Sequence, residues 1–297
     1  MHQLAKAQSA RMNDLQVDVY VAPAIPTATG SEDPSKTWFS PICCTLIQGP
    51  TSAVLVDTPT TIELSEGLAE WVKKTARGKN LRYIYTTHAH GDHFLGNPVL
   101  LRHFPEAKCV TTSLVVAGIK RQWPQSLDLW RQLFPNGQVS DAQNVPEPLP
   151  DSGEFSIDGH SLFGIDVPHS DTEASSFLHV PDLNLVVCGD IVYGDCYQFF
   201  GEASTAAKRA KWLKSLDQIA SLNPHIVVPG HKRETQADGP YLIEATKHYI
   251  LAFEEELVKA NDADELEGAM VSRYPQRWNK FLLEWSCKSS VSELTKP

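Results

Sequence analysis

The segment Thr87–His93 (THAHGDH) places three histidines and one aspartate directly after an apolar, β-prone run. Side chains alternate with period two along extended backbone, so His88 and His90 are expected to point the same way. The turn opened by the glycine then lets Asp92 and His93 face a second, neighbouring point. Two such points predict a site for two adjacent metal ions. The ligand set is rich in imidazole, which favours zinc.

Three more potential ligands lie downstream, each just after an apolar, strand-like run that ends in proline or glycine. They are His169 after 165–168, Asp190 after 185–189 and His231 after 226–230. A side chain placed at a strand end is held by rigid scaffold, as a preorganised site requires. Three such positions together predict that the chain completes the metal site from its second half.

Composition narrows the kinds of partner that we expect. The chain has 297 residues, of which 42% are hydrophobic and 21% charged, which is typical of a globular protein with a large core. The net charge of −10 disfavours a nucleic-acid partner, because nucleic-acid binders normally carry a basic face. No run approaches the roughly 18 apolar residues of a membrane span, so we expect no membrane association.

The cysteines give a weaker indication of the compartment. The six cysteines lack CxxC spacing and are few for the length of the chain, which favours reduced thiols in a cytoplasmic protein. No apolar run of signal-peptide length is visible near residue 1. The oligomeric state, monomer or homodimer, stays open.

The order of predicted elements indicates the fold. Behind a polar lead-in at 1–16, strands, a helix, a strand and a helix are followed by a second series of the same kind. Two such β/α halves predict an α/β fold in which two sheets pack face to face between outer helices, a four-layer αββα sandwich. We expect one domain over 1–297, with a core at 17–240, an inserted helical or loop region at 114–150 and a C-terminal helical extension at 241–297.

The same residues resemble the metallo-β-lactamase superfamily. Its hallmark is His-x-His-x-Asp-His, followed by a His, an Asp and a His at later strand ends, and this chain matches all of these in order over about residues 42–235. One departure is Pro168, where the family often has glycine before the third histidine. The resemblance implies two zinc ions, with iron or manganese as alternatives. It implies a first metal at His88, His90 and His169, a second at Asp92, His93 and His231, and Asp190 bridging the two.

The resemblance also implies a mechanism. A hydroxide bridging the two metals would attack a substrate carbonyl, while the metals polarise its oxygen and stabilise the leaving group. Asp92 would in addition orient the nucleophile and shuttle its proton. Tyr193, three residues after Asp190, is similar in position to a tyrosine of the superfamily's lactonases that donates a hydrogen bond to the substrate carbonyl.

The substrate is expected to be a small carbonyl compound. The preferred prediction is hydrolysis of a lactone, lactam or ring carbamate, because aromatic residues surround the site and no basic patch for polyanions is evident. Candidate pocket residues are Trp38, Phe39, Phe199 and Phe200.

Other activities remain open. A thioester hydrolase of the glyoxalase II kind is the alternative, with Lys232, Arg233 and Lys247 available to grip a carboxylate. A mononuclear-iron sulfur dioxygenase and a non-catalytic binding protein are two further readings. The complete set of seven ligand positions argues against both of them.

Overall fold

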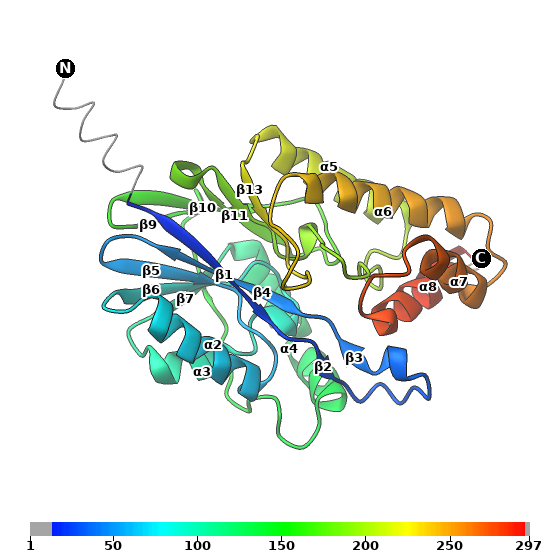
Figure 1. Ribbon diagram of the computed structural model, residues 1–297, viewed down its shortest axis with the longest axis horizontal. Helices are drawn as coiled ribbons and strands as arrows, with labels where there is room; N and C mark the ends of the chain where they lie inside the picture. The colour runs from blue at the N-terminus through cyan, green and yellow to red at the C-terminus, as the bar shows by residue number, and fades with distance from the viewer. Residues whose placement is uncertain (1–13, 295–297) are drawn as a thin grey trace.

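The computed structural model describes residues 14–294, so most of the predicted lead-in at 1–16 lies outside it. Two sheets form its centre (Figure 1). The first has six strands in the order β1-β4-β5-β6-β7-β8, and the second has five in the order β13-β12-β11-β10-β9. The strands of the first sheet are β1 Gln16–Ala22, β4 Ile42–Gln48, β5 Ser52–Val56, β6 Asn80–Tyr85, β7 Lys108–Thr111 and β8 Glu147–Pro148.

The second sheet mixes hairpins with one parallel pair. Its strands are β9 Glu154–Ile157, β10 His160–Asp166, β11 Ser176–Val180, β12 Leu185–Val187 and β13 Ile226–Val228. Neighbouring strands are antiparallel except β12 and β13, which run parallel. A separate two-stranded ribbon pairs β2 Ile25–Pro26 with β3 Trp38–Phe39.

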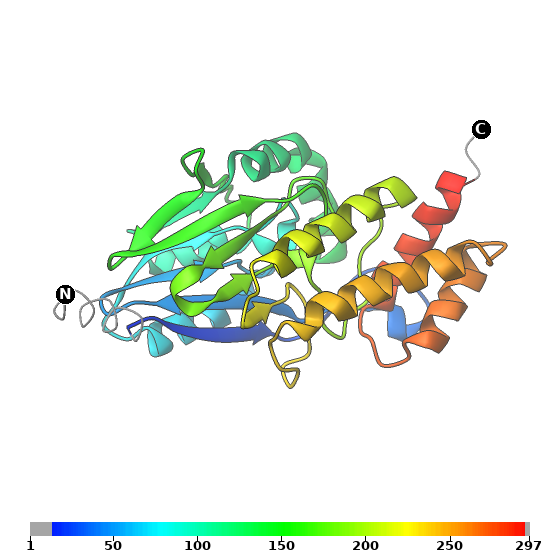
Figure 2. The ribbon, with the colours of Figure 1, turned by 90° about the horizontal axis from the view of Figure 1, so that it is seen from above.

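Helices cover the outer face of each sheet (Figures 1 and 2). On the first sheet lie α2 Ile62–Thr75, α3 Asn97–His103 and α4 Ser113–Leu133. On the second lie α5 Ala206–Ser221 and α6 Tyr241–Leu257, followed by α7 Ala263–Arg273 and α8 Lys280–Leu294. Helices α2, α4 and α5 each begin at a threonine whose hydroxyl accepts a hydrogen bond from a first-turn N–H, at Thr61, Thr112 and Thr205.

Three clusters of buried hydrophobic residues pack between the layers of sheets and helices. One lies between the two sheets and joins Val54 and Tyr85 of the first to Leu162 and Leu178 of the second. Another fills the space between the first sheet and α2, α3 and α4, and the last fills the space between the second sheet and the later helices. The αββα sandwich predicted from the order of elements is thus confirmed.

Two segments show how the predicted regions are built. The segment 114–150 supplies almost all of α4, whose Val115 and Ile119 are buried in the core, and also the edge strand β8. The extension after residue 240 forms α6, α7 and α8, and α6 packs its Ile250 and Phe253 into the core of the second half. Both segments therefore help to form the layered core.

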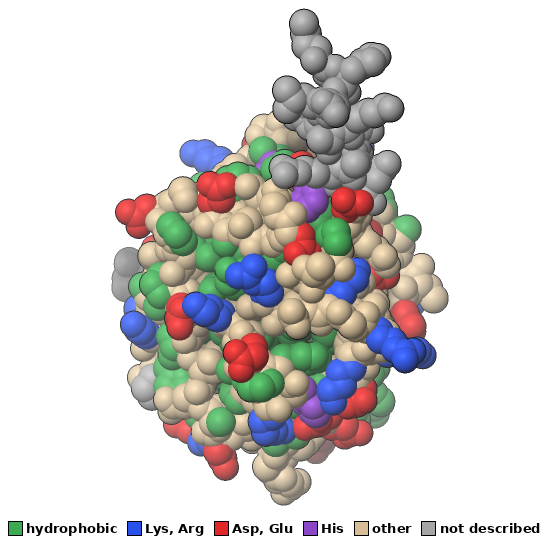
Figure 3. All heavy atoms as spheres, turned by 90° about the vertical axis from the view of Figure 1, so that its left-hand side faces the viewer, with side chains coloured by type: hydrophobic (Ala, Val, Ile, Leu, Met, Phe, Trp, Pro, Cys, Tyr) green, Lys and Arg blue, Asp and Glu red, His purple; other side chains and the backbone are tan. Residues whose placement is uncertain are grey.

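Charged side chains of both signs lie on the surface, while the thiols lie inside. The face in Figure 3 carries Lys, Arg, Asp and Glu side chains intermixed, without a continuous patch of one sign. All six cysteines are free and buried. Within residues 14–294, no helix is both long and apolar enough to cross a membrane.

Candidate metal centre

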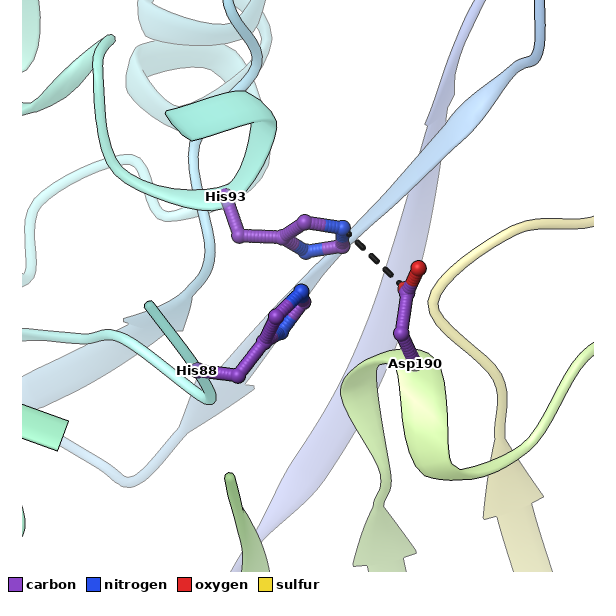
Figure 4. A group of neighbouring side chains, drawn as sticks. All are labelled: His88, His93 and Asp190. Carbon is purple, nitrogen blue, oxygen red and sulfur yellow. Dashed lines mark ion pairs between the residues drawn. The ribbon is translucent and has the colours of Figure 1, made fainter. Parts of the chain in front are cut away.

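The ends of β6, β12 and β13 bring the predicted ligands to one place between the sheets. The cluster after β6 ends in a short 3-10 helix, Gly91–His93, while Asp190 lies in another after β12, and His231 follows β13. Figure 4 shows His88 and His93, from the cluster after β6, and Asp190, from the segment after β12, pointing toward one another. Gly230 is required here, because a Cβ atom at this position would lie 2.0 Å from Oδ1 of Asp190.

Three overlapping groups of side chains have donor atoms close enough to hold a metal ion. In each group all donor atoms lie within 4.8 Å of one another: His88, His93 and Asp190; His88, His90 and Asp171; and Asp92, His93 and His231. Six of the seven predicted ligands therefore meet. His169 belongs to none of the groups found among residues 14–294, and Asp171 was not among the predicted ligands.

Hydrogen bonds to the far nitrogens orient two of the rings. Nδ1 of His93 lies 2.8 Å from Oδ2 of Asp57, and Nδ1 of His231 lies 2.7 Å from the carbonyl oxygen of Pro41. If Nδ1 carries the proton in both rings, each presents its unprotonated Nε2 to the centre. Such outer partners fix the tautomer and the direction of a metal-binding histidine.

The centre contains buried polar atoms without hydrogen-bond partners in the described part of the chain. They are Nε2 of His88, Oδ2 of Asp171 and Oδ1 of Asp190. Leaving such groups unpaired costs free energy, so a buried set of imidazole nitrogens and carboxylate oxygens facing one another calls for a cation. The residues present fit the divalent metal that the fold implies.

The electrostatics of the metal-free centre agree with this. Burial would lower the pKa of His93, but the charges of Asp190, Asp92 and Asp57 outweigh it and raise the pKa to about 10. Burial would raise the pKa of Asp190, yet the neighbouring His231 and His93 hold it well below its usual range. Despite burial, which acts to lower it, the charges of Asp190 and Asp92 also raise the pKa of His231. In the absence of metal, protons on His93 and His231 therefore neutralise the carboxylates, and a bound cation would replace those protons.

Tyr193 lies beneath the centre. Its side chain is buried, and its hydroxyl donates a short hydrogen bond to Oδ2 of Asp190. Burial and the Asp190 charge raise the pKa of Tyr193 well above its ordinary value. Its ring stacks on that of His231, with 5.6 Å between the ring centroids. Tyr193 does not line the cavity that opens onto the centre. In this arrangement Tyr193 contacts a metal-ligand candidate, and its contact with substrate stays a prediction.

A cavity of about 310 Å³ opens onto the metal centre. His90, Asp92, Asp171, Asp190 and His231 lie on its wall, and none of its described lining residues is Lys or Arg. Its apolar wall comes mainly from α4, α8 and the loop before α5: Phe39, Leu129, Trp130, Leu133, Phe199, Leu282 and Trp285.

Two of the four predicted pocket residues line this cavity, Phe39 and Phe199. Side chains alternate along a strand, so Trp38 points away from its neighbour Phe39; it is 42% exposed and lines a separate surface depression. Phe200 is fully buried and packs 4.5 Å from the ring of Phe253.

The basic residues considered for a carboxylate grip are engaged elsewhere. Lys232 pairs with Asp238, and Lys247 pairs with Asp217 and Glu244. Arg233 lies over the ring of Trp278, at 5.7 Å. None of the three lines the cavity.

The chain is similar to proteins of a known family over most of its length. The model of the metallo-beta-lactamase superfamily matches residues 38–231, so the chain belongs to this superfamily of mostly metal-dependent hydrolases. Among solved structures, a metallo-beta-lactamase family protein from Thermus thermophilus is 19% identical, with a TM-score of 0.60 and 93% of each chain covered. A metallo-beta-lactamase from Pontibacter korlensis is 16% identical, with a TM-score of 0.56, over 80% of this chain and 95% of that one. These identities show the common fold alone.

Curated relatives are similarly distant. The lactamase-like protein adaB of Aspergillus niger is 24% identical over 57% of this chain and 45% of its own length. The atrochrysone carboxyl ACP thioesterase dmxR1 of Cryptosporiopsis sp. is 21% identical over 75% of this chain and 59% of its own length. The chain thus spans about half the length of the curated relatives it matches.

Proposed function

We propose that this protein is a binuclear, zinc-dependent hydrolase that opens a small cyclic ester or amide, namely a lactone, lactam or ring carbamate. The observation that carries the proposal is the meeting of the three metal-capable groups with an apolar cavity whose described lining contains no Lys or Arg. When bound, two divalent ions would make a deprotonated water available near neutral pH and polarise the substrate carbonyl. The residues around them position the ions and the substrate.

Asp92 is the proposed proton carrier. Burial would raise the pKa of Asp92, but the His93 and His231 charges lower it, so the group is a carboxylate. It reaches the cavity wall, and its Oδ2 lies 3.4 Å from Nε2 of His231. A carboxylate there can orient a nucleophilic water and pass its proton to the leaving atom.

The cavity wall favours an uncharged substrate. Aromatic rings from three segments, Phe39, Trp130 and Trp285, surround the approach to the centre, and apolar walls bind an apolar ring through burial of its surface. A glutathione thioester brings carboxylates that would need basic partners, and Lys232, Arg233 and Lys247 lie outside this cavity. The glyoxalase II alternative therefore loses the residues on which it was based.

A thioester with an apolar acyl group is the second candidate. Likeness to a carboxyl ACP thioesterase favours it, and the cavity wall accepts an apolar acyl chain as well as a ring. The chemistry at the carbonyl would be the same, with a thiolate in place of an alkoxide or amide as the leaving group.

A substrate panel separates the candidates. Zinc-loaded protein is assayed with lactones, lactams, cyclic carbamates, a glutathione thioester and an apolar acyl thioester, with Asp92→Ala as the matched control. We expect the highest kcat/KM on the cyclic esters or amides and a loss of activity in the control. A thioester preferred by orders of magnitude would promote the second candidate. Full activity in Asp92→Ala would refute the assigned role of that residue.

A further inference from the structure

The segment from His169 to Ser175 carries a candidate ligand that sequence patterns did not single out. Asp171 is completely buried, and its Oδ2 lies 2.7 Å from Nδ1 of His90 and 3.8 Å from Nε2 of His88. The contact of Oδ2 with Nδ1 of His90 is an ion pair whose angles do not meet hydrogen-bond geometry, and Nε2 of His88 makes no hydrogen bond with any described residue. These atoms approach one another without hydrogen-bond geometry, as the ligands of one shared ion do.

The other carboxylate oxygen of Asp171 is fixed by its own loop. Oδ1 accepts hydrogen bonds from the hydroxyl of Ser170 at 2.7 Å and from the N–H of Thr172 at 2.8 Å. The hydroxyl of Ser170 lies 2.6 Å from that of Ser175, whose residue bridges to His88. A carboxylate held by one oxygen leaves the second free to face a metal, and outer hydrogen bonds of this kind orient metal ligands.

The ring of His90 is fixed in the matching orientation. Its Nε2 lies 3.2 Å from Oε1 of Glu202, while the hydroxyl of Thr172 donates to Oε2 of the same carboxylate at 2.6 Å. The Glu202 carboxylate can accept a hydrogen bond from Nε2–H, which leaves Nδ1 of His90 to face Asp171.

Both the ring and the backbone of His169 make hydrogen bonds to neighbouring residues. Its Nδ1 lies 2.6 Å from the carbonyl oxygen of Ser170, and its own carbonyl accepts the hydroxyl of Ser215 in α5 at 2.5 Å. It shares no metal-capable group with any described residue.

We infer that Asp171, in place of His169, completes the first metal site with His88 and His90. The inference rests on the metal-dependent function proposed above. Both sites would then use two imidazoles and one carboxylate, with Asp190 between them. Carboxylate oxygen suits a harder ion such as Mn²⁺ better than imidazole does, so this centre should bind Mn²⁺ more readily than a site with three imidazoles.

Metal content tests the ligand assignment without an activity assay. Protein stripped with chelator is reloaded with Zn²⁺ or Mn²⁺, and bound metal is measured by mass spectrometry after removal of excess ion. Asp171→Ala is expected to lose about one metal ion per chain relative to the unchanged protein, whereas His169→Ala is expected to keep its full content. Asp171→Asn, which retains the size of the side chain, replaces Asp171→Ala if that variant does not fold. The opposite pattern would overturn the inference.

Cobalt-loaded protein gives a second, independent readout. Exchangeable imidazole N–H signals of ligands to Co²⁺ shift far outside the normal proton range, and four are expected, from His88, His90, His93 and His231. A fifth that disappears in His169→Ala would contradict the inference. Asp171→His should add a signal and raise the affinity for Zn²⁺ relative to Mn²⁺.

The two proposals fail in different ways. If Asp171→Ala keeps all its metal while the unchanged protein hydrolyses a substrate of the panel, the ligand assignment fails and the function stands. If the unchanged protein takes up none of the ions, both fail.

Discussion

Asp57, at the end of β5, accepts a hydrogen bond from Nδ1 of His93 at 2.8 Å across 36 residues of sequence. The same carboxylate accepts the N–H and the hydroxyl of Thr87, both at 2.8 Å. It therefore joins the two ends of the histidine cluster to the strand beside it. Its backbone has a φ of +62°, a conformation that aspartate and asparagine tolerate better than most residues.

Asp57→Asn should consequently weaken metal binding without unfolding the protein. Asparagine keeps the size and the backbone preference but loses the charge that orients His93, and changes to such outer partners typically cost about 10–100-fold in metal affinity. A competition titration with a zinc chelator measures the change. Asp151→Asn, in an exposed turn, is the matched control and should leave the affinity unaltered. Equal affinity in the two variants would show that Asp57 does not orient the site.

Gly118 lets α4 pack closely against the ligand-bearing loops. A Cβ atom there would lie 2.2 Å from that of Ala174 and 3.1 Å from that of Ala89. In a free helix, Gly→Ala stabilises by about 1 kcal/mol, but overpacking a core costs about 1–3 kcal/mol, so Gly118→Ala should lower the free energy of unfolding. Gly268→Ala in α7, where nothing lies within 4 Å, should raise it. Urea unfolding of both variants measures the sign of each change in the free energy of unfolding. A stabilised Gly118→Ala would mean that the loops carrying Ala89 and Ala174 move to accept the added methyl group.

Asp158, in the turn between β9 and β10 of the second sheet, makes hydrogen bonds to the start of β5 in the first sheet. Its carboxylate accepts the N–H groups of Thr51 and Ser52 at 2.8 and 2.9 Å, and their hydroxyls as well. Burial acts to raise the pKa of Asp158, but these hydrogen bonds outweigh it and lower the pKa. A carboxyl with a lowered pKa contributes stability above its unfolded value of about 3.9, and the contribution is lost as the pH falls through the folded value.

Asp158→Asn should therefore destabilise the protein at neutral pH, by about 1–3 kcal/mol. The difference from the unchanged protein should shrink as the pH falls below about 4. Urea unfolding across this pH range measures it, with Asp128→Asn, on the exposed side of α4, as control. A difference that does not vary with pH would indicate that the charge of Asp158 is not what holds the sheets.

Phe199 and Phe200 are neighbours with different environments. Phe200 is fully buried among Trp212, Tyr249 and Phe253, so Phe200→Ala should cost about 3–5 kcal/mol of stability. Phe199 lines the cavity, 5.8 Å from the ring of His90, so Phe199→Ala should raise KM for an apolar substrate and cost less stability. Thermal unfolding and steady-state kinetics distinguish them. Equal losses of stability would place both in the core.

Much of the fold could be predicted because its signals are local. The order of strand-like and helix-like runs predicted two β/α halves, and the structure builds them as two sheets covered by helices. The family resemblance rested equally on a short motif, Thr87–His93. Short strands were harder: β8 spans only two residues, Glu147–Pro148, and is defined by its pairing with β7 rather than by any pattern of its own.

By itself the sequence determined that imidazoles and carboxylates gather at strand ends, because strand propensity and ligand spacing are written in neighbouring residues. Only the tertiary structure decided which side chains of the loop after β10 face that centre. There, Ser215 of α5 holds the backbone of His169, and the pairing of Ser175 with His88 brings Asp171 inward. Side-chain direction in an irregular loop depends on packing partners that are distant along the chain, and no local pattern encodes them.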